Sequence, residues 1–175
     1  MKNAYPELPV VPYMKTAVEM GAVVSFLKAV DFPVAVKRAA YCFFRIESGN
    51  GKSGVNNNYA GIQADGARWP AVYDDLIVAT SEKKENGTGK LRRFVGFNSW
   101  QDSLRFTLRN SQRRGLYVGG HTSHITEMDV RTPTDLCIAY KREWVTGNSG
   151  YQPNYTMEVK PFLSIYTQAV TLFPE

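Results

Sequence analysis

The sequence predicts a mainly helical α+β domain with one small β-hairpin lobe. Apolar residues recur at helical spacing in segments near both ends of the chain. Between them lie two strand-like segments, "DLIVATSEK" and "KLRRFVGF", joined by "KENGTG". Hydrophobic residues make up 43% and charged residues 21% of the 175 residues, which is typical of a globular protein. We expect an irregular arm over residues 1–13 and a single domain over residues 14–175.

Two helices are expected in the first third of the chain. Residues 14–30 have the apolar density of a buried helix. The second helix should run over residues 34–48, with Asp31 as a possible N-cap and Pro33 near its first turn. Its apolar face is marked by residues at i, i+3, i+4, i+7 and i+8, namely Val36, Ala39, Ala40, Phe43 and Phe44. The glycines of "GNG" should end this helix.

The middle of the chain is expected to form a loop and then a hairpin. Residues 49–70 are rich in glycine and asparagine, which favours a loop. Asn86 and Gly87 are typical of a two-residue hairpin turn between the two predicted strands. A helix should follow from Ser99, with Asp102 three residues later in a variant of the capping box.

The last third should be mainly helical. Residues 115–132 are loop-like, and a helix is expected to start at Pro133. The segment "GNSGYQPN" should interrupt the chain before a final helix that Pro161 kinks.

Charge and cysteine content restrict the function only broadly. Lys and Arg number 21 against 16 acidic residues, and the net charge of +5 favours a polyanionic partner such as cell wall, nucleic acid or a membrane surface. Cys42 and Cys137 lie in apolar runs and are expected to be buried thiols rather than a disulfide framework. The segment that begins the sequence lacks the apolar core of a signal peptide, so we expect a chain made in the cytoplasm.

Glu47 is the residue that suggests catalysis. It follows Phe43 and Phe44 by four and three residues, so it shares their apolar face. It also lies in the last turn of its helix, where the helix dipole disfavours a carboxylate. Both effects favour the protonated acid near neutral pH, which is the form that protonates a leaving-group oxygen. The alternative is an exposed glutamate at a helix end.

The neighbouring "GNGKS" does not fit a phosphate-binding loop. That motif needs a glycine five residues before the glycine of "GKS", and this position is Ile46. The loop should also follow a strand, whereas here it follows a predicted helix. His121 and His124 form an H-x-x-H pair without a third ligand cluster, so no metal or other cofactor is expected.

Five segments resemble the peptidoglycan glucosaminidases of glycoside hydrolase family seventy-three, a lysozyme-like group. "ESGNGKS" at residues 47–53 and "NNYAGIQ" at 57–63 resemble its Glu-Ser-Gly-Trp-Gly-Lys-Ser and Asn-Asn-x-Phe-Gly-Ile-Lys motifs. "ATSE", "RRFVGFNSWQDSLRF" and "SGYQPNY" then resemble later motifs of the family in the same order. The resemblance covers roughly residues 33–166, and it implies a lysozyme-like fold.

The resemblance also implies roles for matching residues. Glu47 would be the catalytic acid, Glu82 the second carboxylate and Tyr151 a tyrosine that steadies the transition state. Asn58, Tyr59 and Gly61 would hold the loop beneath the glycan. We further expect three residues to bind the substrate, namely Gln63, Trp69 and Tyr155. Two carboxylates suit glycoside hydrolysis, with inversion, retention and assistance by the substrate's N-acetyl group left open.

Four departures put the register of the substrate in doubt, and one of them is that the "GYQPNY" segment is two residues shorter than the family form. Asn50 replaces a tryptophan of the family, Ala60 replaces a phenylalanine, and Gln63 replaces a lysine. The alternatives are therefore a muramidase or a non-catalytic lysozyme-like module that binds glycan or a protein.

The expected partner is the glycan strand of peptidoglycan, with neither nucleic acid binding nor membrane insertion. An enzyme made without a signal peptide would reach the periplasm or cell wall by another export route. It could then be an interbacterial toxin with a cognate immunity protein.

Overall fold

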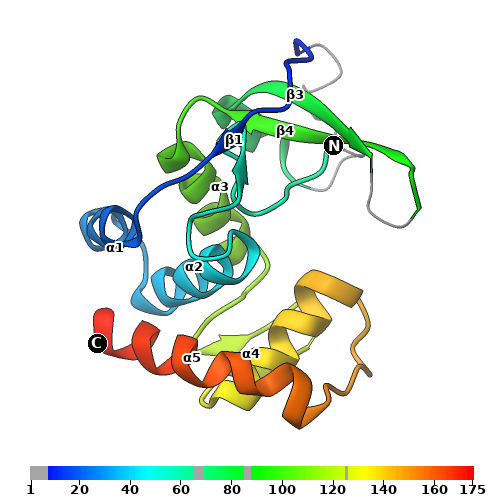
Figure 1. Cartoon of the computed structure of the whole chain (residues 1–175). Helices are drawn as coiled ribbons and strands as arrows, with labels where there is room; N and C mark the ends of the chain where they lie inside the picture. The colour runs from blue at the N-terminus through cyan, green and yellow to red at the C-terminus, as the bar shows by residue number, and fades with distance from the viewer. Residues whose placement is uncertain (1–7, 65–68, 85–87, 125) are drawn as a thin grey trace. The chain divides into compact units, whose positions relative to one another are not determined.

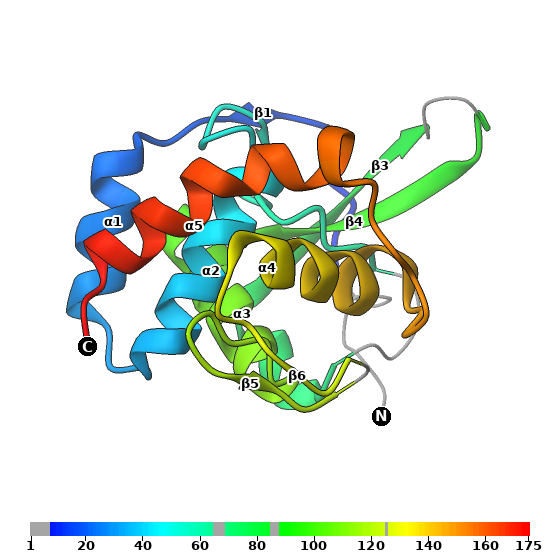
Figure 2. The same ribbon diagram turned by 90° about the horizontal axis from the view of Figure 1, so that it is seen from below.

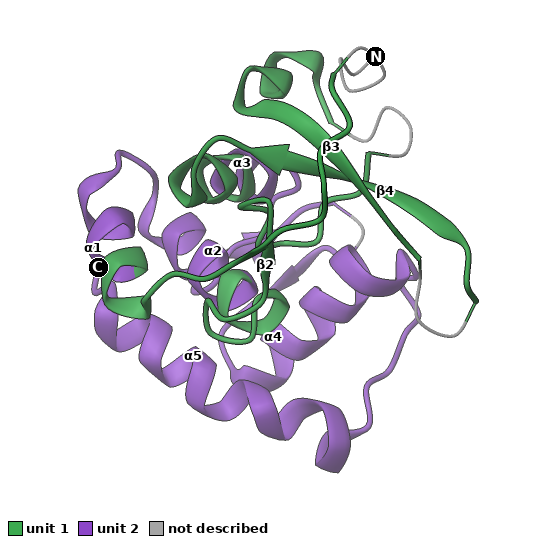
Figure 3. Ribbon diagram, turned by 45° about the horizontal axis from the view of Figure 1, so that its top comes forward, with its two compact units in different colours: residues 1–23, 44–107 green, residues 24–43, 108–175 purple. Residues whose placement is uncertain are grey.

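A computed structural model of the chain describes residues 8–64, 69–84, 88–124 and 126–175. The chain divides into two compact units, each built from two separate stretches (Figure 3). Unit 1 comprises residues 1–23 and 44–107, and unit 2 comprises residues 24–43 and 108–175. Within the described ranges, no helix combines the length and the apolar character needed to cross a membrane.

Unit 1 is organised around the predicted hairpin. Strands β3 (Ile77–Lys84) and β4 (Leu91–Phe97) pair antiparallel, with Glu82 opposite Arg93 (Figure 1). The chain before β1 adds a bridge between Val10 and Thr80 on the outer side of β3. On the other side, Ala64 donates its backbone N–H to Arg93 and thereby lines up the preceding loop with β4. The hairpin is thus the centre of a small sheet whose two outer members come from distant parts of the sequence.

A second, shorter pairing also belongs to unit 1. Strand β1 (Lys15–Thr16) pairs antiparallel with β2 (Gly54–Val55). The apolar core beside the sheet is aromatic: the Phe106 ring of α3 (Trp100–Arg113) lies 5.1 Å from the Trp69 ring and 5.6 Å from the Phe97 ring, between centroids. A 3-10 helix, Ala71–Leu76, leads into β3.

Unit 2 is mainly helical. Helices α4 (Pro133–Tyr140) and α5 (Lys160–Leu172) pack together (Figure 2). Helix α4 also contacts β6 (Met128–Asp129), which pairs with β5 (His121–Thr122). The ring of Tyr140 lies 5.6 Å from that of Phe162 and 5.6 Å from that of Phe43, between centroids. Buried Arg38 donates from Nε to the Phe173 carbonyl, 2.8 Å away, and so satisfies the end of α5.

Most predicted elements are confirmed, and the fold class is α+β with a predominance of helix. Helix α2 spans Val34–Glu47, and its five predicted apolar residues are all buried. The predicted helix over residues 14–30 is shorter, since α1 runs over Met20–Ala29. Residues before it are extended because they pair with β2. The predicted turn at Asn86 and Gly87 lies outside the described residues.

The helix ends differ in detail from the predictions. Ser99 donates its hydroxyl to Asp102 and accepts the Asp102 backbone N–H, which forms the expected cap of α3. Pro161 does not interrupt a continuous α-helix, because α5 begins at Lys160 and places the proline in its first turn. The residues before it, Tyr155–Val159, form a π-helical turn. Both cysteines are buried and free, as expected.

Candidate active site

Glu47 is the last residue of α2 and is half-buried. Three residues earlier, Phe44 is buried and stacks on Tyr59, with ring centroids 5.1 Å apart. This contact anchors the last turn of the helix on the "NNYAGI" segment. The two motifs are therefore in contact within unit 1.

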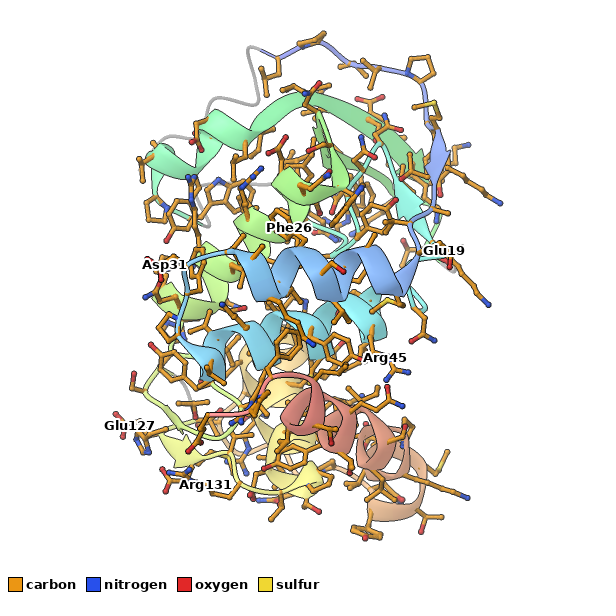
Figure 4. All side chains as sticks on the ribbon, turned by 90° about the vertical axis from the view of Figure 1, so that its left-hand side faces the viewer. Glu19, Phe26, Asp31, Arg45, Glu127 and Arg131 are labelled. Carbon is orange, nitrogen blue, oxygen red and sulfur yellow. The ribbon has the colours of Figure 1, made fainter. Side chains whose placement is uncertain are left out.

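The turn after Glu47 is built from left-handed residues. Gly49, Asn50 and Gly51 have φ values of 54°, 60° and 82°. Asparagine tolerates this region better than most residues, and the Asn50 side chain accepts a 2.7 Å hydrogen bond from Nε of Arg45 (labelled in Figure 4). A Cβ on Gly51 would lie 2.2 Å from the Val18 carbonyl oxygen, so this position requires glycine. "GNGKS" is therefore the turn that ends α2, whereas a phosphate-binding loop would follow a strand.

The three consecutive asparagines have separate structural tasks. Asn56 and Asn57 are left-handed, with φ values of 48° and 60°. Asn57 donates to the carbonyl of Phe97. Buried Asn58 donates to the carbonyls of Ile62 and Val95, both at 2.9 Å, and accepts the Ile62 backbone N–H. The asparagine run thus fixes the loop against β4.

A pocket of about 150 Å³ opens beside Glu47 in unit 1. Pockets for drug-sized ligands measure ~300–1,000 Å³, so this one suits part of a larger ligand, such as a single ring. Nine residues line it: Tyr13, Glu47, Ser53, Val55, Asn58, Tyr59, Gly61, Lys83 and Phe94. Among the described lining residues, Glu47 is the only carboxylate. Burial raises the pKa of the Tyr59 hydroxyl, partly offset by its hydrogen bond with Thr16.

The structure brings four predicted site residues together, since Glu47, Asn58, Tyr59 and Gly61 all line this pocket. Gln63 instead bridges to Phe94 at the sheet edge. Trp69 is buried in the aromatic core and donates its indole N–H to Asp74 at 2.9 Å. Gln63 and Trp69 therefore do not line the pocket, and their roles in glycan binding stay predictions.

Glu82 lies on the hairpin, and its side chain pairs with Arg93. Nη2 of Arg93 is 3.1 Å from Oε1 of Glu82, and both side chains are partly exposed. Successive side chains of a strand point to opposite faces. Lys83 lines the pocket, so Glu82 and its cross-strand partner Arg93 point away from that face. Its role as second carboxylate stays a prediction.

Tyr151 and Tyr155 belong to unit 2. The Tyr151 hydroxyl donates to the two carboxylate oxygens of Glu158, at 2.8 and 3.1 Å, and Lys141 Nζ lies 2.8 Å from the same carboxylate. The hydrogen bond from Lys141, followed by those from the Asn154 backbone and Tyr151, lowers the pKa of Glu158 to about 2. Tyr155 is 63% exposed. This cluster ties residues 151–158 to the end of α4.

The two histidines are held separately in unit 2. His121 pairs with Asp129 and His124 with buried Glu143, at 2.8 and 2.9 Å between ring nitrogen and carboxylate oxygen. Over the described ranges, no group of three or more metal-ligating side chains is present.

The site residues predicted from the sequence omit five residues that line the pocket, namely Tyr13, Ser53, Val55, Lys83 and Phe94. Phe94 and Lys83 lie diagonally across the hairpin on one face, which an exact strand register would have revealed. Tyr13 reaches the pocket through long-range pairing of the N-terminal segment, which leaves no local pattern in the sequence.

No family model and no curated protein matches the sequence. Among solved structures, the chain is similar to the crystal structure of a peptidoglycan hydrolase mutant from Sphingomonas sp. A1. The two are 18% identical, the match covers 85% of this chain and 98% of that chain, and the TM-score is 0.42.

Proposed function

We propose that the protein is a glycoside hydrolase that cleaves the glycan strand of peptidoglycan, as an endo-β-N-acetylglucosaminidase with Glu47 as general acid. One observation carries the proposal. The acid of the "ESGNGKS" motif and three residues of the "NNYAGIQ" motif line a single pocket, although the two motifs are separate in sequence. The chemistry requires an acid that is partly withdrawn from water and open to a sugar ring.

In the proposed reaction, Glu47 donates its proton to the glycosidic oxygen as the bond to the sugar breaks. The oxocarbenium-like sugar is then stabilised by an electron-rich partner, and water adds to its anomeric carbon and gives up a proton to a carboxylate, which completes the hydrolysis. The resemblance assigns the role of the electron-rich partner to Glu82 and assigns stabilisation of the transition state to Tyr151. The pairing of Glu82 with Arg93, on the strand face opposite Lys83, favours the alternative in which the substrate's own N-acetyl oxygen is the partner.

The substitutions that suggested a non-catalytic module have structural explanations here. Asn50, in place of the family's tryptophan, adopts a left-handed conformation and binds Arg45. Ala60 is buried within the loop, with 4% of its surface exposed. Neither change removes Glu47 or closes its pocket, so a catalytic function is favoured over binding alone.

Digestion of purified peptidoglycan tests the proposal directly. The soluble products are reduced and identified by mass spectrometry, which locates the new reducing end. N-acetylglucosamine at the reducing end is the expected result. N-acetylmuramic acid there would make the enzyme a muramidase. Retention on the insoluble wall without any soluble product would favour the non-catalytic module.

The proposed site of action is the bacterial wall, because the substrate is found there. The net charge of +5 supports attraction to an anionic wall. A role as an exported toxin, neutralised by an immunity protein, is a further proposal. It is tested by directing the chain to the periplasm or leaving it in the cytoplasm of a bacterial host. Lysis is expected only in the first case.

A further inference from the structure

The segment before α1 contributes to the wall of the Glu47 pocket. Its backbone pairs with β3, since Thr80 donates its N–H to the Pro9 carbonyl and Val11 donates to the Thr80 carbonyl, at 2.9 and 2.8 Å. A few residues later, β1 pairs with β2, next to the Glu47 turn. The segment over residues 9–16 is therefore fixed at both ends within unit 1. We call it the clamp segment.

Asn56 holds the middle of the clamp segment. Its side-chain oxygen accepts the Met14 backbone N–H at 2.7 Å, and its side-chain nitrogen donates to the Pro12 carbonyl at 3.0 Å. Its backbone N–H also donates to the Met14 carbonyl. Asn56 is 7% exposed, so these bonds are sheltered from water. Tyr13 lies between the two bound residues, and its backbone position is therefore fixed.

Tyr13 and Lys83 meet at the pocket. Both line it, and the Lys83 ammonium nitrogen lies 5.7 Å from the centroid of the Tyr13 ring. Tyr13 is 40% exposed, so its ring offers a flat apolar surface next to a positive charge. Flat rings bind the apolar face of a sugar, and an ammonium group binds a carboxylate as a point charge.

We propose that Tyr13 and Lys83 form a subsite beside Glu47 for a sugar unit that carries a carboxylate. Tyr13 stacks on the ring, and the ammonium group of Lys83 pairs with the carboxylate. This inference rests on the proposed function and specifies its substrate. In peptidoglycan, the carboxylate belongs either to the lactyl group of muramic acid or to the peptide attached there. Tyr13 lies outside residues 33–166, the stretch that resembles the glucosaminidase family, and Lys83 directly follows the "ATSE" motif.

The test is a binding titration of the full chain carrying Glu47→Gln, which prevents turnover. The probes are a peptide-free tetrasaccharide of alternating N-acetylglucosamine and N-acetylmuramic acid, the same tetrasaccharide with its peptides, and uncharged chitotetraose. We expect at least one carboxylate-bearing probe to bind about tenfold more tightly than chitotetraose at low salt, with the preference shrinking at high salt. Preference for the peptide-free probe identifies the lactyl carboxylate, and preference for the peptide-bearing probe alone identifies the peptide.

Further substitutions in the same parent distinguish the contributions of Tyr13 and Lys83 to binding. Lys83→Met should abolish the preference and Lys83→Arg should keep it. Tyr13→Ala should weaken all probes about tenfold, whereas Tyr13→Phe should bind like the parent. Met14→Ala and Lys84→Ala are matched controls, because these neighbours are exposed and do not line the pocket. Thermal melting of each variant verifies that the protein remains folded.

The inference is overturned if the parent shows no preference, if Lys83→Met retains it, or if Tyr13→Ala binds every probe like the parent. The wild-type digestion distinguishes this failure from that of the proposed function. If the wild type releases soluble glycan products but the Tyr13 and Lys83 variants bind the probes like the parent, the subsite alone is contradicted. If no products are released and no probe binds, both the proposed function and the subsite are contradicted.

Discussion

The ring of Phe44 stacks on the ring of Tyr59, with centroids 5.1 Å apart and planes inclined by 27°. This contact joins the last turn of α2 to the loop that forms the floor of the pocket. Glu47 follows Phe44 on the same helix face, so the helical turn that carries Glu47 is anchored by a buried aromatic pair.

Glu47→Gln should lower the rate of peptidoglycan digestion by about 10²–10⁴-fold, because glutamine keeps the shape of the side chain but has no proton to donate. The melting temperature should change little. Glu19→Gln, an exposed change in the same unit, is the matched control and should digest peptidoglycan at the wild-type rate (Figure 4). Equal rates for the two variants would remove Glu47 from the mechanism.

Glu82→Gln should keep more than about a tenth of the wild-type activity, since Glu82 faces away from the pocket side of the hairpin. The loss of its pair with Arg93 should change the free energy of unfolding by less than about 1 kcal/mol, as both side chains are partly exposed. Initial rates and urea unfolding check the two statements. A loss as large as that of Glu47→Gln would make Glu82 the second carboxylate.

Three glycine-to-alanine changes should differ in sign and size. Gly21→Ala lies in α1 with no atom near the new Cβ, and should stabilise the protein by roughly 0.5–1 kcal/mol. Gly61→Ala also meets no atom but has a φ of +61°, and should cost about 1–2 kcal/mol. Gly51→Ala combines a φ of +82° with a clash against the Val18 carbonyl, and should cost more than Gly61→Ala. Urea unfolding gives this order, and a Gly51→Ala cost no larger than that of Gly61→Ala would contradict the clash.

Glu158 should stabilise unit 2 only above acidic pH. Its pKa is lowered from 4.5 to about 2 by hydrogen bonds from Lys141, Asn154 and Tyr151. A lowered pKa in the folded state means that the stabilisation is complete above pH 4.5 and disappears as the pH falls to about 2. The wild type should therefore have a higher melting temperature than Glu158→Gln at neutral pH. This difference should vanish as the pH falls from 4.5 to about 2. A constant difference across the range would exclude this linkage.

The hairpin and α2 could be predicted because their signals are local. Alternation and β-rich composition identify β3 and β4, and the spacing of apolar residues identifies α2. The two left-handed asparagines, Asn56 and Asn57, explain why the loop is rich in that residue, although the sequence alone indicates only a loop. The predicted start of the first helix was wrong for residues 14–19, where pairing with a distant strand outweighs the local helical preference.

The site could be predicted only where residues lie in motifs. Glu47, Asn58, Tyr59 and Gly61 reach one pocket, as the resemblance implies. Which of the adjacent residues Glu82 and Lys83 reaches the pocket depends on which face of β3 points inward. No local sequence pattern fixes this face for a partly exposed strand. Trp69 has the type of side chain that stacks on sugars, but its environment is set by long-range packing against Phe106.

The clamp segment has a consequence for the order of folding. The Asn56 bonds to it join residues 42 and 44 positions apart, whereas helix α2 needs only local contacts. Contacts between distant parts of a chain tend to form late. During refolding, helical content should thus recover before glycan binding does. A partly folded chain would contain Glu47 on its helix without the wall that presents a sugar to it, and would be inactive until the last step of folding is complete.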